Sequence, residues 1–319
     1  MDNQKKVCVV GVGYWGKNYI KTLSNLSIPF SIVEKNTKVI IELKKEYPKI
    51  DFYNNIEDSF ENHDSYIIVT PPITHYEIGM KCLNHNKNVL IEKPLTLNPE
   101  DSELLYKKAK DVNKTLAVGH LLLFHPAIRL IKEYIDNKDL GNLQYIYSNR
   151  LNLGKVRQDE NVLWSLAPHD ISIIQFLLNF SYPNKIQCIG SKIANEKMHD
   201  ITTTFLEYSD QNVDAHIFVN WLNPFKDHSL VVVGDKKMIT FNGVTNELLL
   251  HHKFLNKENF NIESIDVPVE KIDYEFDYPL TLQIKHFLSN KNNPNIEYIG
   301  GKEAIDVMNI LNDASSQLL

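Results

Sequence analysis

A glycine pattern near the N-terminus, Gly11-x-Gly13-x-x-Gly16, constrains the fold of this chain more than any other stretch. It follows an apolar run at residues 7–10 without polar alternation, which is typical of a strand buried on both faces of a parallel sheet. Gly11 permits a tight turn, Gly13 lets a ligand approach the backbone, and Gly16 allows a helix to pack closely on the strand. Because a helix that begins near Gly16 directs its first N–H groups at an anion, the stretch predicts a dinucleotide pyrophosphate site.

An acidic residue follows at the spacing that a dinucleotide site requires. Residues 30–33 are predicted to form the second strand, and Glu34 lies 18 residues after Gly16. A carboxylate there accepts hydrogen bonds from both ribose hydroxyls of an adenosine and repels a 2′-phosphate. We therefore expect NAD rather than NADP, although Lys35 and Lys38 are close enough to weaken the repulsion. The alternative is a glycine turn beside an unrelated surface glutamate.

The composition is that of a globular protein and argues against several classes of function. The chain has 319 residues, of which 43% are hydrophobic and 23% charged, enough for two domains with their own cores. Its net charge of −6 favours neither a nucleic-acid nor an anionic-membrane partner. No apolar run is long enough to span a bilayer, and the first strand starts too early for a signal peptide. Three cysteines without metal-ligand spacing indicate reduced thiols, so we expect a cytoplasmic protein without a bound metal.

Two kinds of sequence pattern divide the chain near residue 120. Before it, short apolar runs alternate with helical segments, which predicts a doubly wound parallel sheet with right-handed crossovers. After it, runs of alternating apolar and polar residues follow one another, which predicts a largely antiparallel open sheet with one covered face. We therefore expect an α/β Rossmann domain at residues 1–120 and a substrate-binding α+β domain at residues 121–319. The last two predicted helices, 280–288 and 302–318, are expected to return to the first domain.

Three motifs in the first domain resemble those of the Gfo/Idh/MocA oxidoreductases, and the resemblance extends over essentially the whole chain. They are Gly-Val-Gly-Tyr-Trp-Gly-Lys-Asn at 11–18, Thr-Pro-Pro-Ile-Thr-His at 70–75 and Glu-Lys-Pro at 92–94. Segments 119–126, 162–170 and 233–241 are most similar to the branch that oxidises the 3-hydroxyl of UDP-linked N-acetylhexosamines or their uronic acids. The resemblance implies cofactor contacts from Tyr14, Trp15, Thr70, Pro71, His75, Glu92 and Lys93, beside Gly11, Gly13, Gly16 and Glu34.

Lys93 is the first candidate for catalysis. It lies at the carboxyl end of a predicted parallel strand, where open α/β sheets bind ligands. Its ammonium can donate a hydrogen bond to a reacting hydroxyl and stabilise the negative charge that develops as hydride leaves the carbon. The family often has the Lys–Pro bond in the cis form, so the resemblance implies a cis bond before Pro94. An exposed lysine at a strand end is the alternative.

His169 is the second candidate. Pro168 is predicted to lie in the first turn of a helix whose apolar stripe runs through residues 171–178. The positive end of the helix dipole disfavours the charged form of a first-turn histidine, which can then accept a proton near pH 7. Many relatives carry an aspartate four residues before this histidine, where this chain has Ser165. The alternative is that His169 and Asp170 merely cap a helix.

A group of cations is a candidate for contacts to the substrate. Arg150, Lys155 and Arg157 precede Trp164 in the sequence, and guanidinium groups bind a diphosphate or carboxylate through paired hydrogen bonds. A solvated loop is the alternative. The predicted substrate-binding residues are His120, Arg150, Arg157, Trp164 and Asp170.

These observations predict an NAD-dependent 3-dehydrogenase of a UDP-linked N-acetylated hexose or hexuronate, which serves surface-polysaccharide biosynthesis. In this hypothesis His169 accepts the hydroxyl proton and Lys93 stabilises the oxyanion. The alternatives are a dehydrogenase of inositol or another free polyol, and a non-catalytic NAD-bound sensor. The resemblance also implies a homodimer or homotetramer joined through the C-terminal sheet.

Overall fold

The computed structural model describes residues 6–153, 160–194, 196–256, 261–264 and 268–318. By their contacts the residues form two compact units, Met1–Leu121 with Tyr278–Met308, and Leu122–Asp277 with Asn309–Leu319. The second unit thus differs from the predicted 121–319 domain by the segment Tyr278–Met308, which belongs to the first.

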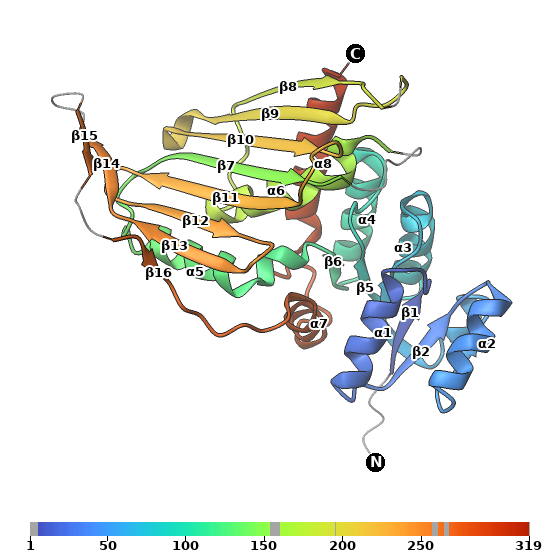
Figure 1. The fold of residues 1–319 in the computed structure, drawn as a ribbon. Coiled ribbons are helices and arrows are strands. Elements are labelled where there is room, and N and C mark those ends of the chain that lie inside the picture. Colours follow the sequence, from blue (N-terminus) through green and yellow to red (C-terminus); the bar gives the residue numbers. More distant parts are fainter. Residues whose placement is uncertain (1–5, 154–159, 195, 257–260, 265–267, 319) are drawn as a thin grey trace. The chain divides into compact units, whose positions relative to one another are not determined.

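The first unit contains a six-stranded sheet in the order β3-β2-β1-β4-β5-β6, with every pair parallel (Figure 1). This confirms the predicted doubly wound sheet. The order reverses between β1 and β4, and open α/β sheets bind ligands at such a switch point. The strands are β1 (Lys6–Val10), β2 (Phe30–Val33), β3 (Phe52–Tyr53), β4 (His63–Ile68), β5 (Asn88–Ile91) and β6 (Leu116–Val118).

Local sequence explains where the helices of this unit begin and how closely they pack. The side chain of Asn98 accepts a hydrogen bond from the N–H of Asp101, and Pro99 occupies the first position of α4. In α3, a Cβ at Gly79 would lie 2.8 Å from a methyl group of Ile91, so the glycine lets this helix approach β5. The helices that follow the strands are α1 (Gly16–Asn25), α2 (Thr37–Glu46), α3 (His75–Asn84) and α4 (Pro99–Asp111).

A segment from near the end of the chain completes the first unit. The N–H of Val118 in β6 donates to the carbonyl of Ile299 at 2.8 Å, and the neighbouring Ala117 forms an antiparallel bridge with Gly300. In α7 (Pro279–Ser289), the amide of Gln283 donates to the carbonyl of Val118. Helix α8 (Gly301–Ser316) begins directly after the bridging residue Gly300. Both predicted C-terminal helices therefore exist, and the first packs on the Rossmann sheet as expected.

The second unit is built on an eight-stranded sheet in the order β16-β13-β12-β11-β7-β10-β9-β8 (Figure 1). Its pairs are antiparallel except for β7 with β10, which are parallel because α6 and two strands intervene between them in the chain. The predicted, largely antiparallel sheet is confirmed. The strands are β7 (Leu143–Leu151), β8 (Lys185–Ser191), β9 (Ile201–Tyr208), β10 (Val213–Asn220), β11 (Asp227–Gly234), β12 (Met238–Asn242), β13 (Glu247–His251) and β16 (Glu270–Lys271).

Two helices, α5 (Pro126–Asp136) and α6 (Val162–Leu177), cover one face of this sheet (Figure 1). Side chains alternate between buried and half-buried throughout β9 and along β10 up to Val219, as expected for strands with one covered face. A separate two-stranded antiparallel sheet, β14 (Lys253–Asn256) with β15 (Asn261–Ser264), was not predicted. It follows β13 closely in a stretch whose polar residues gave no strand signal.

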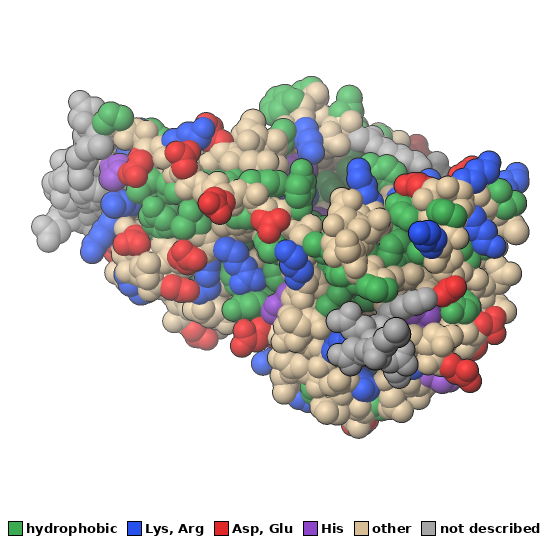
Figure 2. Space-filling model, turned by 90° about the horizontal axis from the view of Figure 1, so that it is seen from below, with side chains coloured by type: hydrophobic (Ala, Val, Ile, Leu, Met, Phe, Trp, Pro, Cys, Tyr) green, Lys and Arg blue, Asp and Glu red, His purple; other side chains and the backbone are tan. Residues whose placement is uncertain are grey.

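The surface and the cysteines agree with an ordinary globular chain. In the face shown in Figure 2, acidic and basic side chains are interspersed rather than gathered by sign. Cys8, Cys82 and Cys188 are buried free thiols. Within the described ranges, no helix combines the length and the apolar character that crossing a bilayer requires.

Candidate active site

The glycine loop has the geometry that the sequence predicts. Gly11 has a φ of +87°, and its N–H donates to the carbonyl of Val33 at 2.9 Å, which joins the turn to β2. A Cβ at Gly16 would lie 2.4 Å from the carbonyl oxygen of Gly11, so only glycine lets α1 start this close to the turn. A Cβ at Gly13 would meet open space. No side chain caps helix α1, and its first turn has no acidic residue. The N–H groups at its N-terminus can therefore donate hydrogen bonds to a bound anion.

A cavity of about 460 Å³ lies at the ends of β1, β2 and β4. Its position coincides with the switch point of the sheet, and its size is within the range of small-molecule sites. Predicted cofactor residues from three separate motifs line it together. They are Gly11, Gly13, Tyr14, Trp15, Glu34, Thr70 and Pro71, joined by Lys35 and Thr74.

Glu34 stands at the end of β2 and holds two parts of the backbone. Its carboxylate accepts hydrogen bonds from the N–H of Val12 in the glycine loop at 2.9 Å and from that of Asn36 at 2.8 Å. The same side chain lines the cavity. A carboxylate at this place can receive ribose hydroxyls, as predicted, and it also fixes the loop.

Glu92 differs from its prediction as a cofactor contact, because its carboxylate points into the protein. Oε1 accepts hydrogen bonds from the indole of Trp15 at 2.8 Å and the hydroxyl of Tyr19 at 2.6 Å. Oε2 accepts the backbone N–H of Lys93 at 3.0 Å. Burial raises the pKa of Glu92, although these donors and the nearby Lys93 charge oppose the rise. Glu92 therefore ties the glycine loop and α1 to the end of β5.

Gly119 makes this arrangement possible. A Cβ at Gly119 would lie 2.9 Å from the carboxylate atoms of Glu92, so any larger residue would displace the buried acid. The N–H of Gly119 donates to the carbonyl of Ile91, which holds the ends of β5 and β6 side by side.

His75 was predicted to contact the cofactor, but its side chain contacts the protein backbone. Its ring is fully buried, with Nδ1 2.8 Å from the carbonyl oxygen of Pro94 and Nε2 2.8 Å from that of Thr70. Burial lowers the pKa of His75. The ring lies between a carbonyl of the loop after β4 and a carbonyl of the loop after β5; a neutral ring can donate to one of them, and a protonated ring to both. The Lys93–Pro94 bond in that second loop is cis, as the resemblance implied.

The start of α6 corrects the prediction for His169. The helix begins at Val162, where the side chain of Asn161 accepts a hydrogen bond from the N–H of Trp164. Pro168 is therefore inside the helix rather than in its first turn. The dipole argument for a neutral His169 does not hold, since that effect fades beyond the first turn. His169 and Ser165, four residues apart on α6, remain on one side of the helix.

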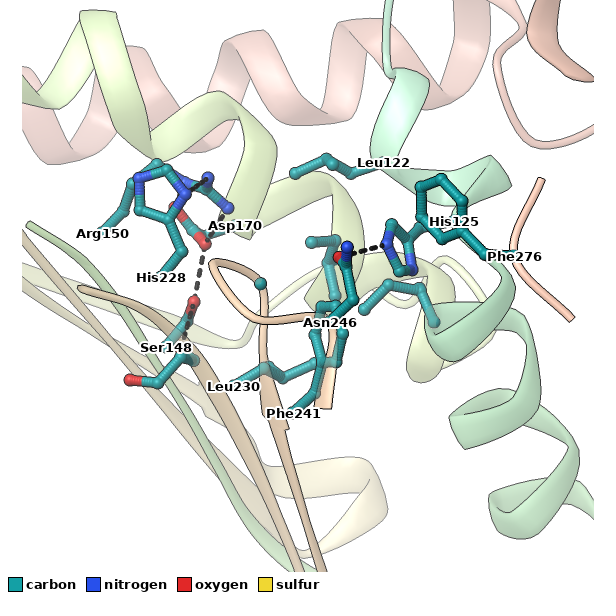
Figure 3. Close-up of a pocket in the computed structure, with 14 residues that line it drawn as sticks. Leu122, His125, Ser148, Arg150, Asp170, His228, Leu230, Phe241, Asn246 and Phe276 are labelled. Carbon is teal, nitrogen blue, oxygen red and sulfur yellow. Dashed lines mark hydrogen bonds and ion pairs between the residues drawn. The ribbon is translucent and has the colours of Figure 1, made fainter. Parts of the chain in front are cut away.

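A second, smaller cavity of about 150 Å³ lies between α5, α6 and the covered face of the eight-stranded sheet (Figure 3). Apolar side chains form much of the cavity wall, and a cluster of polar side chains lies at each end of the cavity. One end carries Ser148, Arg150, Asp170 and His228, and the other carries His125 and Asn246. Ser148 was not predicted, although alternation along β7 places it on the same face as Arg150.

Arg150 and Asp170, both predicted substrate contacts, form a buried ion pair. Arg150 donates from Nε to Asp170 at 2.8 Å and from Nη2 at 3.0 Å, and Ser148 donates to the same carboxylate at 2.6 Å. Burial and the Arg150 charge lower the pKa of the adjacent His228 to about 4. The guanidinium is thus already neutralised by a protein carboxylate.

Trp164, predicted to contact the substrate, has another position. The indole of Trp164 donates to the hydroxyl of Ser315 at 3.1 Å, so it joins α6 to the C-terminal part of α8, which belongs to the same unit. Lys155 and Arg157 lie outside the described residues. In the part of the chain that the structure describes, no group of three or more His, Cys, Asp or Glu residues could hold a metal ion.

Sequence comparisons identify the class of the first unit. The pattern of the family described as "Oxidoreductase family, NAD-binding Rossmann fold" matches residues 5–120, which contain the glycine loop and the larger cavity. The first unit is therefore an NAD-binding Rossmann domain. The pattern of the GFO/IDH/MocA C-terminal domain matches residues 128–240. Because the two matches cover more than half of the sequence, the chain belongs to the Gfo/Idh/MocA oxidoreductase family.

Similar proteins act on different substrates. The UDP-N-acetylglucosamine 3-dehydrogenase of Acidithiobacillus ferrooxidans is 26% identical over 206 residues, which are 64% of this chain and 64% of that enzyme. The alignment thus spans slightly less than two thirds of that relative. The scyllo-inositol 2-dehydrogenase (NAD(+)) of Bacillus subtilis is 28% identical over 306 residues, 90% of this chain and 86% of the relative. A solved structure of the Acidithiobacillus enzyme has the same fold, with a TM-score of 0.84 at 20% identity over 98% of this chain and 97% of that one.

The position of Glu34 predicts the cofactor preference. NADH should bind more tightly than NADPH, and Glu34→Gln should narrow the ratio of the two dissociation constants by about tenfold, because it removes the charge that repels a 2′-phosphate. The amide keeps an oxygen that can still accept the N–H of Val12. Titration by NAD(P)H fluorescence measures both constants. Glu42→Gln, an exposed change on α2, should leave the ratio unchanged. Tighter NADPH binding by the unaltered protein would show that Lys35 or Lys38 controls the site.

The buried pair of Arg150 with Asp170 predicts that Arg150→Ala lowers the free energy of unfolding, in addition to any effect on substrate affinity. The change leaves the Asp170 carboxylate buried with Ser148 alone, and removing one partner of a buried pair typically costs about 3–5 kcal/mol. Urea unfolding measures the free energy. Lys226→Ala, which removes an exposed cation near β11, is the control and should change it by less than about 0.5 kcal/mol. An equally small change for Arg150→Ala would contradict the importance of the pair.

Proposed function

We propose that this protein is an NAD-dependent dehydrogenase that acts on a CH–OH group of a sugar-like substrate. The observation that carries the proposal is the cavity at the β1–β4 switch point, lined by the glycine loop and Glu34. An uncapped helix N-terminus and a ribose-binding carboxylate suit a dinucleotide. Lys93 follows β5, the strand beside β4, so a cation stands near the carboxyl edge where substrates of such sheets bind. Membership of an oxidoreductase family supports the same reaction class.

In this proposal Lys93 stabilises the reacting oxygen. Its ammonium donates a hydrogen bond to the substrate hydroxyl and favours the negative charge that grows on the oxygen during oxidation. The backbone around Lys93 is held from two sides, since Glu92 accepts its N–H and His75 bonds the carbonyl of Pro94. These contacts restrict the backbone position from which the Lys93 side chain extends. Electrostatic catalysis requires a charged group that is positioned in advance. NAD, when bound, supplies the hydride acceptor.

We assign the role of proton acceptor to His169. The support is the family resemblance of the segment 162–170, because the helix-dipole argument was lost with the true start of α6. His169 is half-buried, so a ligand can reach it. Relatives with an aspartate in place of Ser165 can orient the histidine with a carboxylate, whereas Ser165 offers a hydroxyl. A proton acceptor held this way contributes about 10²–10⁴-fold to the rate.

For the substrate we propose a UDP-linked N-acetylated hexose or hexuronate that is oxidised at C3. The resemblance of segments 119–126, 162–170 and 233–241 and the Acidithiobacillus relative support this assignment. Arg150 supports this assignment less than the sequence suggested, because Asp170 neutralises its charge and it cannot serve as an unpaired diphosphate ligand. A free cyclitol is the second candidate, and the Bacillus relative, aligned over 90% of this chain, favours it.

Substrate competition separates the two candidates. If the substrate is a nucleotide sugar, UDP-N-acetylglucosamine or its uronate should reduce NAD, UDP alone should compete, and free N-acetylglucosamine should not turn over. Binding energy from the nucleotide positions the sugar, so truncation lowers turnover as well as affinity. NADH absorbance follows the reaction. Rapid NAD reduction by scyllo-inositol, with no competition by UDP, would replace the nucleotide sugar by a cyclitol.

The assigned roles predict a separation of turnover from cofactor binding. Lys93→Ala and His169→Ala should each lose about 10²–10⁴-fold in kcat and keep nearly the same affinity for NADH. Steady-state kinetics and NADH fluorescence titration give the two quantities. Lys107→Ala, an exposed lysine on α4, is the control and should retain full activity. A fully active His169→Ala protein would show that another group accepts the proton.

A further inference from the structure

His120 is a buried polar side chain whose hydrogen-bonding groups are unused. It follows β6 and has 3% of its surface exposed. Neither Nδ1 nor Nε2 has a hydrogen-bond partner among the described residues. Buried polar atoms nearly always have a partner, because leaving them without one costs free energy. Such an exception at the ligand-binding edge of a sheet points to a partner that arrives from outside.

The neighbouring polar groups at this edge have partners within the protein. Glu92, which packs against Gly119, receives three hydrogen bonds. His75 has a backbone carbonyl at each ring nitrogen. Glu92 and His75 therefore hold the loops in place and have little capacity left for a ligand. His120 differs from both, because its ring is placed beside Lys93 and bonds neither loop.

The electrostatics of His120 define the ligand that it can bind. Burial, and then the charge of Lys93, lower its pKa to about 4, so the ring is neutral at physiological pH. A neutral imidazole offers one donor and one acceptor. A hydroxyl group also has both functions, whereas a second cation would be repelled by Lys93. The residues that line the dinucleotide cavity come from the region of β1, β2 and β4, not from β6.

We propose that His120 is a substrate-binding residue, whose imidazole hydrogen-bonds a hydroxyl of the polyhydroxylated molecule that reaches Lys93. The inference rests on the proposed function for the nature of this ligand. It extends that function by naming a specificity-determining group on the first unit, at the end of β6. A substrate without a hydroxyl at this position leaves the ring without a partner and is disfavoured.

The first experiment uses the protein without any substrate. His120→Leu replaces an unsatisfied polar ring by an apolar side chain of similar size, so the melting temperature should rise by about 2–4 °C. Tyr208→Phe is the matched control, because the hydroxyl of Tyr208 is also buried without a partner among the described residues. It lies in β9, away from Lys93 in the sequence and in a different unit. A lower melting temperature for His120→Leu would mean that the ring has a structural task and would overturn the proposal.

The second experiment measures ligand binding in the presence of NADH, with UDP-N-acetylglucosamine and scyllo-inositol as probes. His120→Leu should weaken the probe that the unaltered protein binds by about tenfold or more, and leave the NADH affinity unchanged. His120→Asn, which keeps a donor and an acceptor, should recover part of the loss, and Tyr208→Phe should lose none. Unchanged probe affinity in His120→Leu overturns the proposal. If the unaltered protein binds neither probe, the proposed substrate class fails, and the melting comparison alone decides the role of His120.

Discussion

A parallel sheet that is covered on both faces leaves only its strand ends for polar side chains, and this constraint organises the first unit. The interiors of β1, β2, β4 and β5 are almost entirely buried. The candidate site residues of this unit therefore lie at the carboxyl ends of the strands, with Glu34 after β2, Thr70 after β4 and Lys93 after β5. Each of these residues stands on a loop whose ends are fixed by rigid strands. The buried side chains of Glu92 and His75 contact these loops from within the protein. Their contacts hold the loops that carry the candidate site residues in fixed positions.

The sequence predicted much of this unit because the signals are local. The glycine spacing, the unbroken apolar runs and the capped start of α4 each depend on a few neighbouring residues. Glu92 and His75 were assigned to the cofactor for a different reason, namely their place in family motifs. Their true partners, Trp15 and Tyr19 for one and two backbone carbonyls for the other, are distant in sequence and could not be deduced from spacing.

The second unit shows where sequence reasoning was incomplete. Pro168 was interpreted as the start of a helix, although Asn161 offered a suitable cap seven residues earlier. Proline removes one backbone hydrogen bond inside α6, and the packing of an almost wholly buried helix outweighs that loss. The ion pair of Arg150 with Asp170 was also missed, since it requires the helix to lie over β7. Removing two charges from water is costly, so replacing the whole pair by well-packed apolar residues would change stability little, whereas removing one partner would leave a buried charge unpaired.

The bridge between Ala117 and Gly300 has a consequence for the order in which the chain is made. A ribosome releases residues 1–121 long before residues 278–308, yet these later residues pair with the edge at β6. During synthesis of the intervening residues, the Rossmann sheet therefore has an open edge strand, and such edges can pair with other chains. A short β6 of three residues limits that exposure. The nucleotide-binding unit therefore contains the first part of the chain to be synthesised, and it cannot be complete until residues 278–308 follow.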